Sequence, residues 1–322
     1  MPETTTDTKN TQDTEYLLRQ GDFRLRVAPW GASVRGMWWE DEEEHYDCQD
    51  IITAYSGADG SIGSQGEVLM PFPSRIPHGQ YTFQGQTHQL AVSDDFRPHA
   101  MHGSLRGVLW EMTHRSPAEI TFSVVVKESD FSGYPFALRV SVTYRLNERG
   151  LVCDFQAENA GTTDAPFGAG FHPYFTVGSS LIDSDLLTVP FERQQIGGET
   201  TLVAGTEHDF LTPRAVGSLA ANAVYTSPRR DSNGRARVRL NAPDQSRCVT
   251  VWMDETFDYV VLYSGDTQPD SLRRRALAIE PWTCAPNAFN YPERGLTVLK
   301  PGQTLSGSWG VYSSRALSLR VR

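Results

Sequence analysis

Residues 136–146 alternate bulky apolar side chains with small or polar ones, and this pattern constrains the fold more than any other feature. The apolar positions are Phe136, Leu138, Val140, Val142, Tyr144 and Leu146. Successive side chains of a β-strand point to opposite faces of a sheet, so a period of two buries one face and exposes the other. Residues 148–150 then offer a turn, and residues 151–159 resume the extended pattern. The sequence therefore predicts a β-hairpin.

Further strand-like stretches follow along the chain, and no long amphipathic helix is predicted. They span residues 80–90, 119–128, 235–243, 248–255, 259–266 and 306–314. The 19 prolines and 27 glycines interrupt the chain throughout, which suits a sandwich better than alternating strands and helices. We expect an all-β fold, a large antiparallel β-sandwich. Residues 17–322 are predicted to form one domain after a disordered polar leader over residues 1–16.

The composition argues against several classes of function. The net charge of -10 and the lack of a basic stripe disfavour nucleic-acid binding. No apolar run is long enough for a membrane span, and the polar start lacks the apolar core of a secretory signal, so we expect a cytoplasmic protein. The scattered cysteines disfavour a zinc site and a disulfide scaffold, and no metal is predicted. These cysteines are Cys48, Cys153, Cys248 and Cys284. The sequence specifies no oligomeric state.

Four short motifs stand in a fixed order along the chain. They are PFPSRIPHG over residues 71–79, HGSLRGVLW over 102–110, GFHPYF over 170–175 and AIEPWTCAPNAFN over 278–290. Each is weak alone, but the ordered set is specific because chance matches multiply. In this set the chain resembles the aldose 1-epimerase (galactose mutarotase) family, from about residue 28 to residue 312. The resemblance implies a galactose mutarotase-like supersandwich with a sugar site on its concave face.

His172 is the candidate acid. A lone histidine is most often a satisfied core residue, but imidazole titrates near neutral pH and can give and recover a proton within one turnover. Pro173 cannot donate a backbone hydrogen bond and stiffens the turn around the histidine. The resemblance implies that His172 is the general acid.

Glu280 is the candidate base. It follows the apolar run 276–279 and precedes Pro281, so we expect it at the end of a buried strand, where desolvation raises the proton affinity of a carboxylate. A salt bridge to Arg273, Arg274 or Arg275 is the structural alternative. The resemblance favours catalysis, because the family's glutamate in an EP-x-T motif is the base.

The resemblance also implies substrate-binding roles for Arg75, His102 and Asn222. Ser74 precedes Arg75 where the family more often has Asn. Asn222 stands where the family usually has Asp, and Asp209 competes for that role. Asn222 can still donate and accept hydrogen bonds, although it loses the stronger charge-assisted contact.

Other conspicuous side chains receive structural assignments. Arg106 is expected to form an ion pair within a loop. A stacking wall for a pyranose is an alternative to ordinary core packing for the aromatic residues Trp38, Trp39, Trp282 and Phe289.

The leading hypothesis is therefore an aldose 1-epimerase that interconverts the α and β anomers of a free aldohexose. Ring opening and closing require an acid and a base, and no cofactor is expected. A hexose-6-phosphate 1-epimerase is the first alternative, although no basic cluster for a phosphate is evident. A sugar-binding protein that has lost catalysis is the second, and the presence of both His172 and Glu280 counts against it. A small-molecule sugar is the expected partner.

Overall fold

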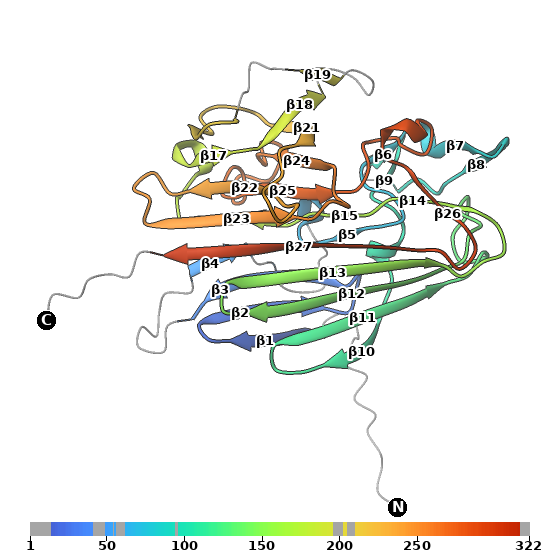
Figure 1. The fold of residues 1–322 in the computed structure, drawn as a ribbon, viewed down its shortest axis with the longest axis horizontal. Helices are drawn as coiled ribbons and strands as arrows, with labels where there is room; N and C mark the ends of the chain where they lie inside the picture. The colour runs from blue at the N-terminus through green and yellow to red at the C-terminus, as the bar shows by residue number, and fades with distance from the viewer. Residues whose placement is uncertain are drawn as a thin grey trace, which may run out of the picture.

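The computed structural model describes residues 14–40, 49–53, 55, 62–93, 96–195, 202–204 and 210–315. Two large antiparallel sheets dominate these residues (Figure 1). The 12-stranded sheet follows the order β1 (Tyr16–Gln20), β2 (Phe23–Ala28), β3 (Ser33–Trp39), β4 (Gln49–Ile52), β16 (Tyr174–Phe175), β25 (Leu277–Trp282), β24 (Tyr259–Tyr263), β21 (Asn222–Pro228), β18 (Phe191–Gln195) and β19 (Leu202–Ala204), with β15 (Gly170–Phe171) and β5 (Val68–Leu69) attached beside β25. The predicted all-β, antiparallel fold class is confirmed.

The second sheet has nine strands within the same described ranges. Its order is β10 (Glu111–Arg115), β11 (Glu119–Val126), β12 (Leu138–Asn147), β13 (Gly150–Asn159), β27 (Thr304–Arg315), β23 (Arg247–Met253), β22 (Ala236–Asn241), β17 (Leu186–Thr188) and β20 (Arg214–Ala215). Figure 1 shows β27 running across the middle of the molecule between β13 and β23.

Small elements complete the described fold. Three two-stranded sheets pair β6 (Arg75–Ile76) with β9 (Ala100–Met101), β7 (Gln80–Phe83) with β8 (Gln86–Gln89), and β14 (Ala165–Phe167) with β26 (Thr297–Leu299). The 3₁₀ turns are η2 (Ile62–Ser64), η3 (Pro77–Gly79), η5 (Leu105–Gly107), η6 (Ile182–Ser184) and η7 (Pro292–Arg294).

The predicted hairpin is confirmed as β12 and β13. Asn147 pairs with Gly150, so the turn contains only Glu148 and Arg149. The inward side chains of β12 are buried and the intervening ones are partly or fully exposed, as the period of two requires. The other predicted strands correspond to β7, β8, β11, β22, β23, β24 and β27.

One hydrophobic cluster contains the inward-facing side chains of both large sheets. From β25, Leu277 and Ile279 belong to this cluster. The alternate residues Ala278, Glu280 and Trp282 lie on the other face of the strand. Strand β24 alternates in the same way: Val260 and Leu262 lie in the core, and Val261 and Tyr263 lie on the opposite face. The outer face of the 12-stranded sheet therefore carries the polar and aromatic side chains of its central strands.

Strand β25 extends beyond the boundary that the sequence predicted. It ends at Trp282, so Glu280 lies within the strand, and the expectation that it stands at the end is wrong. The backbone amides of Ile279 and Thr283 form their hydrogen bonds on the side of β25 where β15 and β16 lie. The backbone nitrogen of Pro281, which lies between these two residues in the strand, faces the same side. On this side β25 pairs first with β16 and then with β15, and the pairing is interrupted between them, at Pro281. The missing amide hydrogen of Pro281 therefore removes no ladder hydrogen bond, and the strand continues.

The N-terminal boundary also shifts slightly. Strand β1 begins at Tyr16, which the predicted leader included, and residues 1–13 lie outside the described residues. Within the described ranges, no helix is both long enough and apolar enough to cross a membrane.

Two segments cover the outer face of the 12-stranded sheet near β25. One contains η2, β5 and β6, and the other contains β9 and η5; β6 and β9 pair with each other. Figure 1 shows β6, β9, β7 and β8 gathered at one end of the molecule. Gly103, between β9 and η5 in the second segment, has φ +69°, and a Cβ atom added there would lie 2.1 Å from the carbonyl oxygen of Met70. A side chain at this position would push the two covering segments apart.

Gly103→Ala should therefore destabilise the protein more than Gly85→Ala. Gly85 has φ +80° in the β7–β8 turn, but a Cβ atom there would meet nothing within 4 Å. Gly85→Ala should lower the free energy of unfolding by about 1 kcal/mol, the cost of a left-handed non-glycine residue. The clash at Gly103 should add about 1–3 kcal/mol. Urea unfolding measures both, and equal losses would contradict the close approach of Gly103 to Met70.

Candidate active site

A pocket of about 200 Å³ lies on the outer face of the 12-stranded sheet, under the two covering segments. All five residues that the sequence predicted as catalytic or substrate-binding line it: Arg75, His102, His172, Asn222 and Glu280. The other described residues of its lining are Gly63, Ser64, Ser74, Phe96, Met101, Val261, Tyr263, Thr267 and Trp282. Side chains from distant parts of the sequence thus converge on one small volume.

Glu280 occupies the floor of this pocket from a central strand. It pairs with Val261 of β24, and its side chain is 2% exposed. Its Oε2 atom has no hydrogen-bond partner among the described residues. A buried carboxyl oxygen without a partner is costly, so the site is built to receive a donor from outside the chain.

His172 stands next to Glu280. Its Nε2 atom is 3.4 Å from Oε1 of Glu280. The backbone is fixed from both sides, since its amide donates to the carbonyl of Glu67 (3.1 Å) and its carbonyl accepts from the amide of Gly66 (2.9 Å). The imidazole is stacked on the ring of Tyr174, with centroids 5.1 Å apart and planes 10° from parallel. The histidine is therefore held rigidly, as the prediction of a pre-positioned group requires.

Burial shifts the proton affinities of this pair in opposite directions. Desolvation raises the pKa of Glu280 well above its ordinary value. Desolvation lowers the pKa of His172, and the Arg106 charge lowers it further. Burial therefore favours the neutral form of each group. Nδ1 of His172 has no hydrogen-bond partner within the described part of the chain.

His102 faces His172 across the pocket, with ring centroids 5.6 Å apart. Its backbone amide donates to the carbonyl of Ser74 (2.9 Å), and the Ser74 amide donates back to Nδ1 of the imidazole (3.1 Å). Both residues adopt positive φ values, 60° for His102 and 58° for Ser74. The reciprocal bonds join the two covering segments and orient the imidazole.

Arg75 and Asn222 lie at the exposed rim. Arg75 belongs to β6, opposite Met101 of β9. Asn222 is the first residue of β21, opposite Tyr263 of β24. Asp209, the competing candidate for the role of Asn222, lies outside the described residues.

The structural alternatives from the sequence resolve in different ways. Arg274 contacts Asp183 and Asp266, and Arg273 contacts Asp270, so the proposed salt bridge from these arginines to Glu280 is wrong. The expected loop ion pair of Arg106 is confirmed by its contact with Glu67 (2.6 Å). Of the four aromatic residues considered for a sugar-stacking wall, only Trp282 lines the described pocket.

Sequence reasoning missed several lining residues. Phe96, Tyr263 and Thr267 reach the pocket from a loop, from β24 and from the turn after β24. The strand at 259–266 was predicted, but only the register that pairs it with β25 places Tyr263 on the face of Glu280. Phe96 carries no periodic or motif signal in the sequence.

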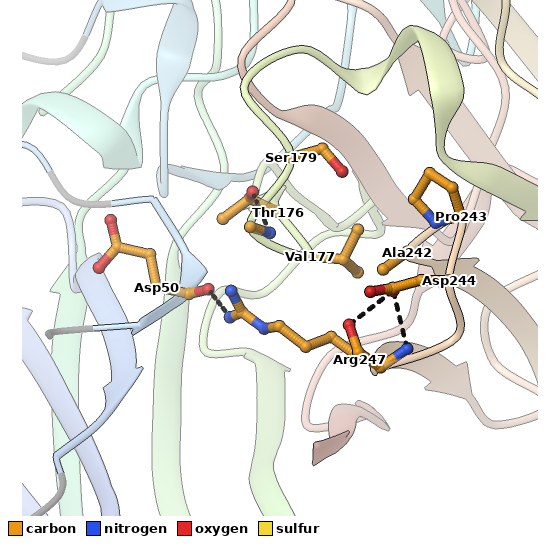
Figure 2. Close-up of a pocket in the computed structure, with 10 residues that line it drawn as sticks. Asp50, Thr176, Val177, Ser179, Ala242, Pro243, Asp244 and Arg247 are labelled. Atoms are coloured by element: carbon orange, nitrogen blue, oxygen red, sulfur yellow. Dashed lines mark hydrogen bonds between the residues drawn. The ribbon is translucent and has the colours of Figure 1, made fainter. Parts of the chain in front are cut away.

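A larger groove of about 700 Å³ lies elsewhere, beside Arg247 (Figure 2). Its polar groups are largely engaged by the protein itself: Arg247 donates to the backbone carbonyl of Asp50 (2.6 Å), and Asp244 accepts from both the amide and the hydroxyl of Ser246. Ser179 likewise donates to Asp185. Its described lining residues include no acid–base pair comparable to His172 and Glu280.

Metal-ligand geometry is not apparent at either site. Within the described ranges, no three His, Cys, Asp or Glu side chains come together as a metal would require.

Comparison with known proteins identifies the family to which this chain belongs. The chain matches the family model for aldose 1-epimerase over residues 14–311. It is 28% identical over 303 residues to the uncharacterized protein YihR of Escherichia coli, covering 92% of each chain. It is 25% identical over 333 residues to galactose mutarotase of Sus scrofa, covering 93% of this chain and 94% of the relative.

Solved structures show the same fold. A GalM/aldose epimerase homologue from C. elegans superposes with a TM-score of 0.81 at 18% identity, covering 94% of this chain and 100% of that one. A putative aldose 1-epimerase from Escherichia coli K12 gives a TM-score of 0.78 at 20% identity, covering 94% and 99%. With the family model matching nearly the whole chain, the protein belongs to the aldose 1-epimerase family.

Proposed function

We propose that this protein interconverts the α and β anomers of a free aldohexose by acid–base catalysis. The observation that carries the proposal is the pair His172 and Glu280, buried 3.4 Å apart on the floor of a small pocket. Each side chain retains a buried polar atom without a partner among the described residues. A bound sugar hydroxyl would supply the missing hydrogen bonds.

The separation of the two groups suits a hemiacetal. The C1 hydroxyl oxygen and the ring oxygen are bonded to the same carbon, so an acid and a base that act on them must lie side by side. Glycosidases instead use two carboxylates about 5–9.5 Å apart. Glu280 is the one carboxylate among the described lining residues, which favours mutarotation over hydrolysis.

In the proposed cycle one proton passes between Glu280, the sugar and His172. Glu280 removes the proton from the C1 hydroxyl while His172 gives a proton to the ring oxygen, and the bond between C1 and that oxygen breaks. The aldehyde at C1 turns to present its other face. His172 then removes the proton from the C5 hydroxyl, the ring closes, and Glu280 returns a proton to the carbonyl oxygen.

The shifted pKa values favour the first half of this cycle. Ring opening begins from ionised Glu280 and protonated His172, and it leaves both groups neutral. Burial favours the neutral forms of both side chains. The same shifts disfavour the ionised starting pair, so the gain on ring opening offsets the cost of moving a proton from Glu280 to His172 beforehand.

His102 is proposed to hold the sugar as a hydrogen-bond donor. Its Nδ1 accepts from the Ser74 amide, so the neutral ring carries its proton on Nε2. Desolvation, with His172, Arg106 and Arg75 adding to it, lowers the pKa of His102 well below its ordinary value and keeps it neutral. Arg75 and Asn222 at the rim are suited to bind ring hydroxyls.

A free sugar fits the described pocket better than a sugar phosphate. Arg75 is the one arginine among the described lining residues, and the nearby Arg106 is paired with Glu67. Phosphate recognition would use several cationic groups. We further propose that the reaction needs no cofactor, because both proton transfers are served by side chains, and that the protein acts in the cytoplasm.

Removing either member of the pair should abolish most of the acceleration. Glu280→Gln and His172→Asn should each lower kcat by about a hundredfold or more, the usual contribution of a general base or acid. Polarimetry of a freshly dissolved hexose measures the rate, and circular dichroism confirms the fold. Near wild-type mutarotation by Glu280→Gln would assign the base to another residue.

The pH dependence of stability should report on buried His102. In the unfolded chain this imidazole titrates near pH 6.5, whereas in the folded protein it stays neutral to a much lower pH. Below pH 6.5 the unfolded state therefore binds a proton that the folded state does not, and the free energy of unfolding falls as the pH decreases. This slope should be smaller by about 1.4 kcal/mol per pH unit in His102→Gln, which does not titrate. Urea unfolding between pH 6 and 5 tests this, and equal slopes in the two proteins would contradict it.

Asn222→Asp should change substrate preference. A charged acceptor strengthens one specific hydrogen bond, so KM should fall more for one epimer of the sugar than for another. The measurement is KM for glucose and for galactose in both proteins. If their ratio is unchanged, Asn222 does not contact the sugar, and Asp209 becomes the residue to test.

A further inference from the structure

One wall of the pocket is formed by two chain segments that a buried polar network joins. Asn222 begins β21, and Tyr263 ends β24 directly opposite it. The Tyr263 hydroxyl is hydrogen-bonded to that of Thr267 in the following turn (2.7 Å). All three side chains line the pocket. Tyr263 pairs with Ala278 of β25, two positions along the ladder from the pair of Val261 with Glu280.

Ser264 connects these segments from behind. It is completely buried and lies immediately after Tyr263. The amide of Ala221, the residue before Asn222, donates to its Oγ atom (2.7 Å), and the Ser264 amide donates to the Ala221 carbonyl (3.0 Å). Its hydroxyl also contacts the carboxylate of Asp266. The serine hydroxyl thus adds a side-chain contact to the backbone pairing that places Asn222 opposite Tyr263.

Arg274 anchors this serine–carboxylate pair to the surrounding chain. Its side chain is only 12% exposed and contacts Asp266 (3.0 Å) and Asp183 (2.8 Å). It also donates to the carbonyls of Gly217 (2.5 Å) and Leu219 (3.0 Å), in the segment leading to β21. One planar guanidinium therefore holds both segments that carry the wall.

We propose that Ser264, Asp266 and Arg274 are positioning residues that set the affinity for the sugar by holding Asn222 and Thr267 in place. This inference rests on the proposed function, and it extends the determinants of substrate binding to side chains outside the described lining of the pocket. Among the described contacts, none joins Ser264, Asp266 or Arg274 directly to His172 or Glu280. The backbone of His172 is held by Gly66 and Glu67, and Glu280 pairs with Val261. Loss of the network should therefore weaken binding of substrate and transition state equally, which raises KM and leaves kcat unchanged.

The test compares Ser264→Ala and Arg274→Gln with a matched control, Arg273→Gln. Arg273 is the neighbouring arginine, but its side chain is 56% exposed and pairs only with the exposed Asp270 among the described residues. Ser264→Ala and Arg274→Gln should each raise KM for the hexose about tenfold, the effect of one misplaced hydrogen bond. Arg273→Gln should keep wild-type KM and kcat. Arg274→Lys, which retains the charge but not the fork of donors, should lie between wild type and Arg274→Gln.

A double-mutant cycle separates positioning from general destabilisation. If Ser264 acts through Asn222, Ser264→Ala should raise KM much less in an Asn222→Ala background than in the wild type. Additive effects, a fall in kcat with KM unchanged, or unchanged KM despite a lower Tm would each overturn the proposal.

Hydrogen exchange provides a readout that does not need turnover. The amides of residues 217–224 should exchange faster in Ser264→Ala and Arg274→Gln than in Arg273→Gln, because their anchors are lost. If the wild-type protein does not accelerate mutarotation, the proposed function fails. Hydrogen exchange of residues 217–224 then remains the test of whether Ser264 and Arg274 hold this segment in place. Unchanged exchange in this segment would overturn the network's positioning role in either case.

Discussion

The close approach of two ionisable side chains in a dry environment is the constraint on which the rest of the site depends. His172 and Glu280 lie 3.4 Å apart, and both are almost completely buried. Burial of either group alone would only penalise its charged form. Burial of both, side by side, leaves a pair that holds one proton and can move it across a short distance. Burial favours the neutral forms of both groups, and in the proposed mechanism the pair reacts when a sugar hydroxyl enters the pocket.

The large sheets supply the rigidity that this pair requires. Glu280 comes from a central strand whose alternate side chains are packed in the hydrophobic core, so its backbone cannot shift without disturbing Leu277 and Ile279. His172 comes from an irregular turn, but its backbone is bonded on both sides and its ring is stacked on Tyr174. The side chains suited to bind the sugar belong instead to the short covering segments and to the ends of strands. The proposed function thus places the proton transfers on the stiffest elements and sugar recognition on short segments and strand ends.

Much of the architecture was predictable because its signals are local. The alternation over 136–146 and the short turn at 148–150 predicted the β12–β13 hairpin, which the structure confirms. Four of the five candidate site residues stand in the ordered motifs, whereas Asn222 was assigned from the resemblance alone, and the structure brings all five to one pocket. The boundary at Glu280 was misjudged because a proline normally ends a strand, and only the interrupted ladder beside it explains the exception. Tyr263, Thr267 and the Ser264–Arg274 network depend on how distant strands pair, which no local pattern specifies.

The central claim is that the wild-type protein catalyses anomer interconversion of a free hexose. The most direct measurement is polarimetry of freshly dissolved α-glucose, α-galactose and glucose 6-phosphate, each with and without the protein. The account predicts that at least one free hexose reaches its normal equilibrium rotation much faster with protein, and that glucose 6-phosphate is accelerated less. Approach to equilibrium at the spontaneous rate for all three sugars would contradict it, and selective acceleration of glucose 6-phosphate would reassign the substrate to a phosphorylated hexose.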